Sequence, residues 1–155
     1  MDDLLALDNQ ICFSLYAANR AITARYRPLL AELDLTYPQY LVMLVLWERA
    51  RAGQATRVSD LGARLRLDSG TLTPLLKRLA SRGLISRERN ADDERVVTIS
   101  LTEQGANLRA QAEQVPQKLL CSLDIPPARL LAMKHELNSI LRVIEAREEK
   151  GGSSA

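Results

Sequence analysis

The sequence predicts a mainly α-helical fold with one small β-hairpin, and three observations support this fold class. Apolar residues recur at steps of three and four in the first and last thirds of the chain, which is the period of amphipathic helices. Two short helical stretches in the middle are joined by a tight polar turn, the pattern of a helix-turn-helix. Apolar and polar residues then alternate on both sides of a second polar turn. We therefore expect a winged helix-turn-helix lobe over 36–102, flanked by helices from both chain ends.

Length and composition exclude several other classes. The 155 residues are 46% hydrophobic, enough for a single domain over 1–150 whose core needs no disulfide or metal. The run 35–47 is too short to span a bilayer and the N-terminus lacks the basic region of a signal peptide, so we expect a cytoplasmic protein. Two distant cysteines and one histidine, His135, make a zinc site or a Cys–His catalytic pair hard to assemble. We expect no metal and no other cofactor.

The first two helices differ in the strength of their end signals. The periodic pattern over 1–35 predicts one long or broken helix. The sequence from Thr36 to Gln39 matches a capping box, with Pro38 in the first turn, and so predicts a buried helix over the apolar run 40–47. The stretch 50–56 contains Gly53 and small or polar residues, and it is expected to be a loop.

The next two helices form the predicted helix-turn-helix. Ser59 can cap the first, and Gly83 fits the end of the second. Thr73 and Pro74, taken alone, would start the second helix at the proline. We favour an earlier start near residues 68–69, because it places a full apolar stripe on one face, namely Leu72, Leu75, Leu76 and Leu79.

The remaining elements are a wing and two C-terminal helices. Strands over 84–89 and 95–101 flank a turn at 90–93. A helix opens at 102–103, Pro116 should kink or interrupt it, and Asp124 with two prolines starts a final helix. That last helix carries an apolar seam of alternating three- and four-residue steps, namely Leu130, Met133, Leu137, Ile140 and Ile144.

A seam outside a compact lobe usually packs on a partner. We expect 1–35 and 103–149 to form a homodimer interface, with docking back onto their own lobe as the alternative. Residues 151–155 are expected to be a disordered tail.

Basic charge is concentrated in one segment. Residues 57–95 hold nine Lys and Arg against six Asp and Glu, and neither flanking segment has a basic excess. The outer face of the second helix of the pair is small, polar and basic, as a helix that enters the major groove of double-stranded DNA must be. Its candidate contacts are Ser69, Thr71, Thr73, Lys77 and Arg78. At the wing, Arg95 can reach a minor groove, with Asp93 close enough to position it. Solvated surfaces without a DNA role are the alternative for both features.

These segments resemble the MarR family of winged-helix repressors. The resemblance is carried by 68–79, 83–85 and 92–95, and it extends over nearly the whole chain. Residues 7–16 and 35–47 are similar to one branch in particular, the organic hydroperoxide resistance regulators (OhrR). The resemblance implies a homodimeric repressor, not an enzyme, that binds an inverted-repeat operator and responds to organic hydroperoxides, with no membrane partner.

In that branch the cysteine at the place of Cys12 is the peroxide sensor. The resemblance implies that the hydroxyls of Tyr16, Tyr26 and Tyr37 surround the sulfur and stabilise its thiolate, some of them from across the dimer. The chemistry agrees, because a thiolate attacks a peroxide O–O bond and phenols can lower its pKa without adding a charge. Tyr16 is four residues from Cys12, so a helix places both on one face.

The second cysteine distinguishes two versions of this sensor. The sequence resembles the two-cysteine type, in which Cys121 is the resolving residue and forms an intersubunit disulfide that releases DNA. The alternatives without a redox role are that Cys12 is a small buried apolar residue and that Cys121 takes no part in sensing. Two other functions stay open: a MarR-like repressor that binds a phenolic ligand noncovalently, and a thiol-dependent peroxidase.

Overall fold

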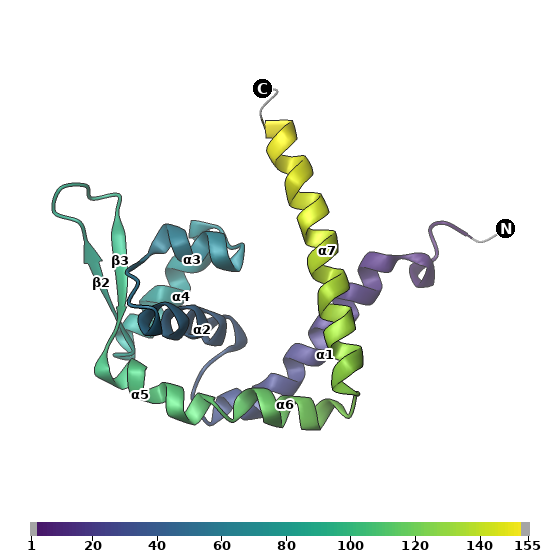
Figure 1. Cartoon of the computed structure of the whole chain (residues 1–155), viewed down its shortest axis with the longest axis horizontal. Coiled ribbons are helices and arrows are strands. Elements are labelled where there is room, and N and C mark those ends of the chain that lie inside the picture. Colours follow the sequence, from purple (N-terminus) through teal and green to yellow (C-terminus); the bar gives the residue numbers. More distant parts are fainter. Residues whose placement is uncertain (1–2, 153–155) are drawn as a thin grey trace. The chain divides into compact units, whose positions relative to one another are not determined.

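The computed structural model describes residues 3–152, and the chain divides into two compact units, 1–119 and 120–155. No helix among the described residues is long and apolar enough to cross a membrane. Helices dominate the chain (Figure 1), in the order 3₁₀ helix η1 Leu7–Asn9, α1 Ile11–Ala31, α2 Tyr37–Arg51, strand β1 Thr56–Arg57, α3 Val58–Leu65, α4 Ser69–Ser81, β2 Ile85–Arg89, β3 Val97–Leu101, α5 Glu103–Ala112, α6 Val115–Leu123 and α7 Pro127–Gly152.

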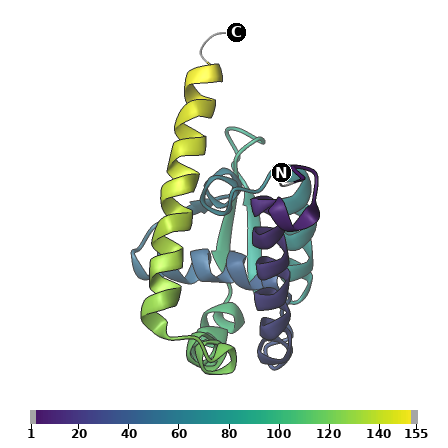
Figure 2. The same ribbon diagram turned by 90° about the vertical axis from the view of Figure 1, so that its right-hand side faces the viewer.

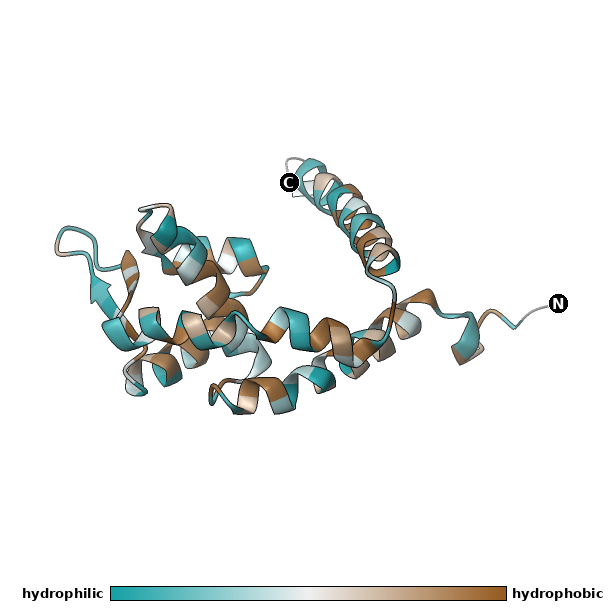
Figure 3. Cartoon of the chain, turned by 60° about the horizontal axis from the view of Figure 1, so that its bottom comes forward, coloured by the Kyte–Doolittle hydropathy of each residue, from teal (hydrophilic) through white to brown (hydrophobic). Residues whose placement is uncertain are grey.

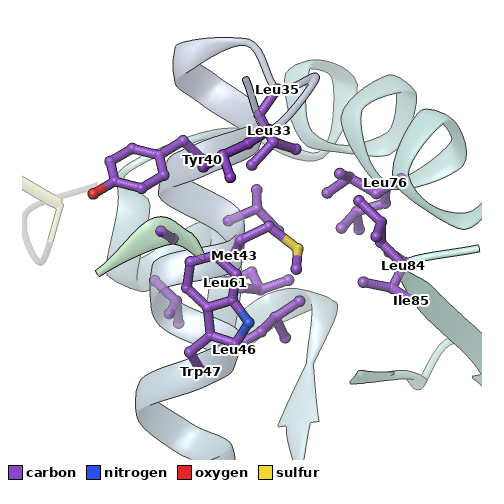
Figure 4. Close-up of a cluster of buried hydrophobic side chains, with 14 of the residues drawn as sticks. Leu33, Leu35, Tyr40, Met43, Leu46, Trp47, Leu61, Leu76, Leu84 and Ile85 are labelled. Carbon is purple, nitrogen blue, oxygen red and sulfur yellow. The ribbon is translucent and has the colours of Figure 1, made fainter. Parts of the chain in front are cut away.

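The core lies within the first unit and is built around α2. This helix buries seven of its residues, whereas α1 buries only Leu30. Leucines from α3 and α4 pack against α2, and Leu84 and Ile85 join the same cluster at the start of β2 (Figure 4). Ile99 of β3 also belongs to this cluster. One continuous core therefore joins the helix-turn-helix, the strands and the end of α1.

The start of α2 confirms the predicted capping box. The backbone N–H of Gln39 donates to Thr36 Oγ1 at 3.4 Å, and the backbone N–H of Thr36 donates to Gln39 Oε1 at 3.0 Å. Pro38 lies in the first turn, where its missing N–H costs no helical hydrogen bond. The first third of the chain was expected to form one long or broken helix. It is broken, because Gln10 is extended between η1 and α1.

The helix-turn-helix is present, with the predicted start of its second helix confirmed and the predicted cap of its first helix wrong. α4 begins at Ser69, capped by Asp68, so the earlier start is correct and Pro74 lies inside the helix. The cap of α3 is Arg57 rather than Ser59, because the Asp60 carboxylate accepts the Arg57 backbone N–H at 2.9 Å and fixes the helix start there.

The hairpin is confirmed, and it belongs to a larger sheet than predicted. β2 and β3 pair antiparallel from Ile85 opposite Leu101 to Arg89 opposite Val97. A third strand, β1, pairs with the other edge of β3 and gives the order β1-β3-β2. This strand begins inside the stretch 50–56 that was expected to be a loop, and α2 extends into the same stretch as far as Arg51.

The C-terminal helices differ from expectation at two ends. The break between α5 and α6 falls at 113–114, and Pro116 is the second residue of α6, where the first turn tolerates it. The final helix begins at Pro127 as expected and is one long helix (Figure 2). It includes Gly151 and Gly152, so these two residues are helical rather than part of a disordered tail, and 153–155 lie outside the described residues.

Candidate functional site

One face of α4 is available for a ligand. Its leucines face inward, with Leu72 1% exposed and Leu76 and Leu79 fully buried. Of the candidate DNA contacts on this helix, Thr73 is half-buried and the other four are exposed, namely Ser69, Thr71, Lys77 and Arg78. The burial pattern thus separates an apolar face from a polar and basic one, as the sequence predicted.

The first turn of α4 is held by its cap. The backbone N–H of Thr71 donates to Asp68 Oδ1 at 2.7 Å. This hydrogen bond is the main reason why the pKa of Asp68 is lowered, with the Thr71 hydroxyl adding to the effect. The charged carboxylate therefore stabilises the start of the helix whose outer face is the candidate DNA interface.

The wing brings Arg95 and Asp93 together. The Arg95 backbone N–H donates to Asp93 Oδ1 at 3.1 Å, and Arg95 Nε lies 3.8 Å from the same oxygen. The arginine side chain is 95% exposed, so the pair adds little to stability. Its effect is to restrict where an accessible guanidinium can point.

Cys12 lies near the start of α1, exposed and with a free thiol. Tyr16 follows one turn later and is 59% exposed, and the Arg20 guanidinium carbon lies 5.5 Å from the centre of the Tyr16 ring. Phe13, Tyr16 and Arg20 line an open hollow along α1. The alternative that Cys12 is a small buried apolar residue is therefore wrong for the single chain.

The other two predicted tyrosines meet at the junction of α1 and α2. The ring centres of Tyr26 and Tyr37 are 4.8 Å apart, and Tyr40 joins them at 5.8 and 6.5 Å. Burial raises the pKa of Tyr26 to about 12, with smaller contributions from Tyr37 and Tyr40, and burial also raises the pKa of each of those neighbours. All three phenols are thus protonated near neutral pH and can act as hydrogen-bond donors. No ring contact among the described residues joins Tyr16 to this cluster.

Sequence reasoning missed Tyr40 as a member of the cluster. Tyr37 and Tyr40 are three residues apart in a helix that the capping box had located, so they share a face. This spacing was a sufficient signal, and the burial of the run 40–47 hid it because Tyr40 was treated as part of the core.

The chain-end helices expose apolar surface. In the first unit, η1 and the first half of α1 expose Leu7, Ile11, Phe13 and Leu15. In the second unit no residue of α7 is buried, and its exposed apolar residues include Met133, Ile140 and Ile144 of the predicted seam. Figure 3 shows hydrophobic and hydrophilic residues alternating along this helix. Apolar stripes of this kind mark surfaces that pack on a partner.

Cys121 lies in α6, exposed and with a free thiol. It belongs to the second unit, whereas Cys12 belongs to the first. Among residues 3–152, no group of three or more His, Cys, Asp or Glu side chains could hold a metal ion.

Comparison with known proteins identifies relatives along most of the chain. Residues 24–111 match the family model of the transcriptional regulator SarA/Rot. The chain is 44% identical over 145 residues to the organic hydroperoxide resistance transcriptional regulator of Bacillus subtilis (strain 168). This alignment covers 94% of the chain and 96% of the relative.

Solved structures show the same similarity in three dimensions. Reduced AbfR of Staphylococcus epidermidis bound to DNA is 36% identical, with a TM-score of 0.70 over 89% of this chain and 94% of that one. A MarR mutant from E. coli complexed with operator DNA is 25% identical, with a TM-score of 0.75 over 90% of this chain and 99% of that one.

The Bacillus relative and the family model are named as transcriptional regulators, which agrees with the expectation that the chain is not an enzyme. The fold, the exposed face of α4 and these similarities lead to one assignment. The chain belongs to the MarR family of winged-helix transcriptional regulators, within the group that includes the organic hydroperoxide resistance regulators.

Proposed function

We propose that the chain is a homodimeric repressor whose binding to operator DNA is switched off by organic hydroperoxides. The observation that carries this proposal is the free thiol of Cys12, exposed on a largely apolar helix face one turn from the Tyr16 phenol. An accessible thiol with a phenol donor nearby can be held as a thiolate, and an apolar approach suits an organic rather than an inorganic peroxide.

DNA binding is supported by the surface of α4 and the wing. α4 is slim on its exposed side, and its hydroxyls and cations suit phosphates and base edges. In the proposed complex α4 of each subunit enters one major groove, and Arg95 enters the flanking minor groove, positioned by Asp93. Two half-sites read by a twofold dimer make an inverted repeat. The relatives AbfR and MarR have each been solved bound to DNA.

The chemical step is a displacement at the peroxide. The Cys12 thiolate attacks the outer oxygen of a hydroperoxide, the O–O bond breaks, and the alkoxide that leaves takes up a proton to give the alcohol. The sulfur is oxidised to sulfenic acid and the peroxide is reduced. The phenol hydroxyls of Tyr16, Tyr26 and Tyr37 are proposed to hydrogen-bond to the thiolate, some of them from the partner subunit.

Resolution by Cys121 completes the proposed switch. The Cys121 thiol of one subunit attacks the Cys12 sulfenic acid of the other, releasing water and forming an intersubunit disulfide. Both thiols are exposed in the single chain, and they lie on helices with apolar faces that suit a dimer. The relative AbfR has been solved in a disulfide-formed state. The new bond would rearrange the dimerisation helices and move the two α4 helices out of register with the half-sites.

A gel-shift experiment tests this proposal. The duplex is selected from a random library by the reduced protein, and wild type, Cys12→Ser and Cys121→Ser are treated with cumene hydroperoxide and then with dithiothreitol. Wild type should release DNA and rebind it after reduction, and Cys12→Ser should stay bound. Release by Cys12→Ser at the wild-type dose would overturn thiol sensing. A wild type that never gives a dimer-sized band on a non-reducing gel would overturn only the Cys121 step.

A noncovalent effector is the second candidate, and one observation favours it. An open pocket of about 660 Å³ lies between α2 and the α5–α6 junction, lined largely by apolar groups that include Tyr40, Leu44 and Trp47. Its lining also includes two arginines and two glutamates, namely Arg51, Arg109, Glu48 and Glu113. An aromatic ligand with a phenol or carboxylate would fit these surroundings. This candidate predicts that Cys12→Ser still responds fully to such a ligand.

A further inference from the structure

Arg82 makes an unusual set of contacts between two helices that are distant in sequence. It is the C-cap residue of α4, and its side chain reaches the turn that follows α1. Its Nη1 donates to the carbonyl oxygen of Asp34, and its Nη2 donates to the carbonyl oxygen of Leu33 at 3.3 Å. The same Nη2 lies 3.4 Å from Asp34 Oδ2. One guanidinium therefore bridges two successive backbone carbonyls and a carboxylate.

These carbonyls lie where α1 ends. The Leu30 carbonyl accepts from the backbone N–H groups of both Leu33 and Leu35, and Asp34 has a left-handed φ of 52° that turns the chain away from the helix axis. The carbonyls of a helix C-terminus lack partners within the helix and carry partial negative charge. A cation that donates to the carbonyls beyond this end satisfies them and complements the dipole.

The position of this contact links the two parts of the proposed switch. α1 carries Cys12 and Tyr26, and Tyr37 opens α2 only three residues after Asp34. α4 carries the exposed face proposed to enter the major groove. Arg82 thus connects the C-terminal end of α1, which carries the proposed sensor, to the C-terminal end of α4, which carries the proposed DNA contacts. The connection is made by hydrogen bonds within the first unit.

We propose that Arg82 is a positioning residue that transmits the displacement of α1, caused by Cys12 oxidation, to α4. The proposal rests on the proposed function, since it requires that oxidation of Cys12 changes DNA affinity. A planar guanidinium with fixed donors transmits position, because two hydrogen bonds to backbone atoms define both distance and orientation. The alternative is that α4 follows α1 only through general packing of the core.

The backbone carbonyls, rather than the Asp34 carboxylate, carry the coupling. The Asp34 side chain is 91% exposed whereas that of Arg82 is 29% exposed, and ion pairs with one end in solvent contribute little. Asp34→Asn keeps both carbonyls, and asparagine tolerates the left-handed backbone. It should therefore preserve coupling, whereas Arg82→Met removes every donor and keeps much of the side-chain volume.

The experiment measures the dissociation constant for DNA before and after cumene hydroperoxide, with Cys12 oxidation followed by intact-mass spectrometry and folding by the melting temperature. The compared quantity is the ratio of the oxidised to the reduced dissociation constant. Lys118→Met is the matched control, because it removes a cation of the same unit that also contacts the end of α1, through an ion pair with the Glu32 carboxylate at 3.6 Å. We expect wild type, Asp34→Asn and Lys118→Met to share one large ratio, and oxidised Arg82→Met to show a ratio at least tenfold smaller.

The possible outcomes distinguish a failure of the proposed function from a failure of the role of Arg82. A wild type whose oxidation leaves affinity unchanged refutes the proposed function. A wild-type ratio that Arg82→Met reproduces in full, with its Cys12 oxidised, refutes the role of Arg82 alone. If Arg82→Met does not fold, Arg82→Lys decides, because an ammonium cannot reproduce the paired fork and should give an intermediate ratio. A full wild-type ratio in Arg82→Lys would contradict the requirement for a bridge.

Discussion

Gly105→Ala is predicted to destabilise the junction between the wing and α5. Gly105 is buried in the first turn of α5. A Cβ built there would lie well inside the van der Waals distance of the Leu84 carbonyl oxygen and 3.0 Å from the Leu84 carbonyl carbon. The obstacle is backbone that is already engaged, since the Leu84 carbonyl accepts the Thr102 N–H at 3.1 Å. The Gly105 carbonyl in turn accepts the Trp47 indole N–H at 2.9 Å. Neither side of the contact can rotate away.

The magnitude follows from two opposed effects. Overpacking a well-filled site costs about 1–3 kcal/mol and occasionally more, and a clash with fixed backbone belongs at the upper end of that range. Replacing glycine by alanine in a helix returns about 1 kcal/mol through helix propensity. The free energy of unfolding should therefore fall by about 2 kcal/mol or more.

Urea denaturation of the two proteins measures this difference. Gly151→Ala is the matched control, because it lies in helix α7, where the added Cβ meets no atom of residues 3–152 within 4 Å apart from the local helix backbone. The control should leave stability unchanged or raise it by up to about 1 kcal/mol. If Gly105→Ala were as stable as the control, the close approach of α5 to Leu84 described above would be refuted.

Four further predictions concern single side chains. Trp47→Phe removes the indole donor from a buried carbonyl and should lower the free energy of unfolding by about 1–3 kcal/mol, measured in urea. The lowered pKa of Asp68 means that its stabilisation is present above the ordinary carboxyl range and is lost as the pH falls through the lowered value. Wild type should therefore lose more stability than Asp68→Asn between pH 7 and acid, and equal losses would contradict the cap. The pKa of Tyr26 is raised to about 12, so stability should fall as the pH rises from 10 through 12, and Tyr26→Phe should lack the corresponding tyrosinate absorbance step. Lys77→Ala should weaken DNA binding and reduce the slope of log affinity against log salt by about 1, whereas Lys134→Ala on α7 should change neither.

Elements with local chemical signals were predictable from the sequence. The Thr36–Gln39 capping box fixed the start of α2, and the apolar stripe of α4 outweighed the misleading signal of Pro74. The hairpin was predictable because alternation and a polar turn coincide. In each case the determining interaction lies within a few residues along the chain.

Features that depend on distant residues were missed. β1 is only two residues long, and it exists because β3 offers a free edge to Thr56 and Arg57, which no local pattern reveals. The cap of α3 was missed although it is local: the Asp60 carboxylate accepts the backbone N–H of Arg57, three residues earlier, and Ser59 is a helical residue instead. The bridge from Arg82 to Leu33 and Asp34 spans nearly fifty positions and required the folded chain.

The candidate site likewise combines features that the local sequence predicts with one that depends on how distant segments pack. Cys12 and Tyr16 share a face because a helix places residues four apart together, and the exposed face of α4 followed from its buried leucines. The meeting of Tyr26 with Tyr37 depends on how α1 packs on α2, and only the family resemblance pointed to it.

The control of DNA binding by the Cys12 thiol is tested most directly by a titration of DNA occupancy against equivalents of organic hydroperoxide, read by fluorescence anisotropy of a labelled operator duplex. Wild type should be released fully near one equivalent per subunit and should bind again after reduction, whereas Cys12→Ser should stay bound throughout. Parallel release curves for wild type and Cys12→Ser would contradict the claim that the Cys12 thiol controls DNA binding.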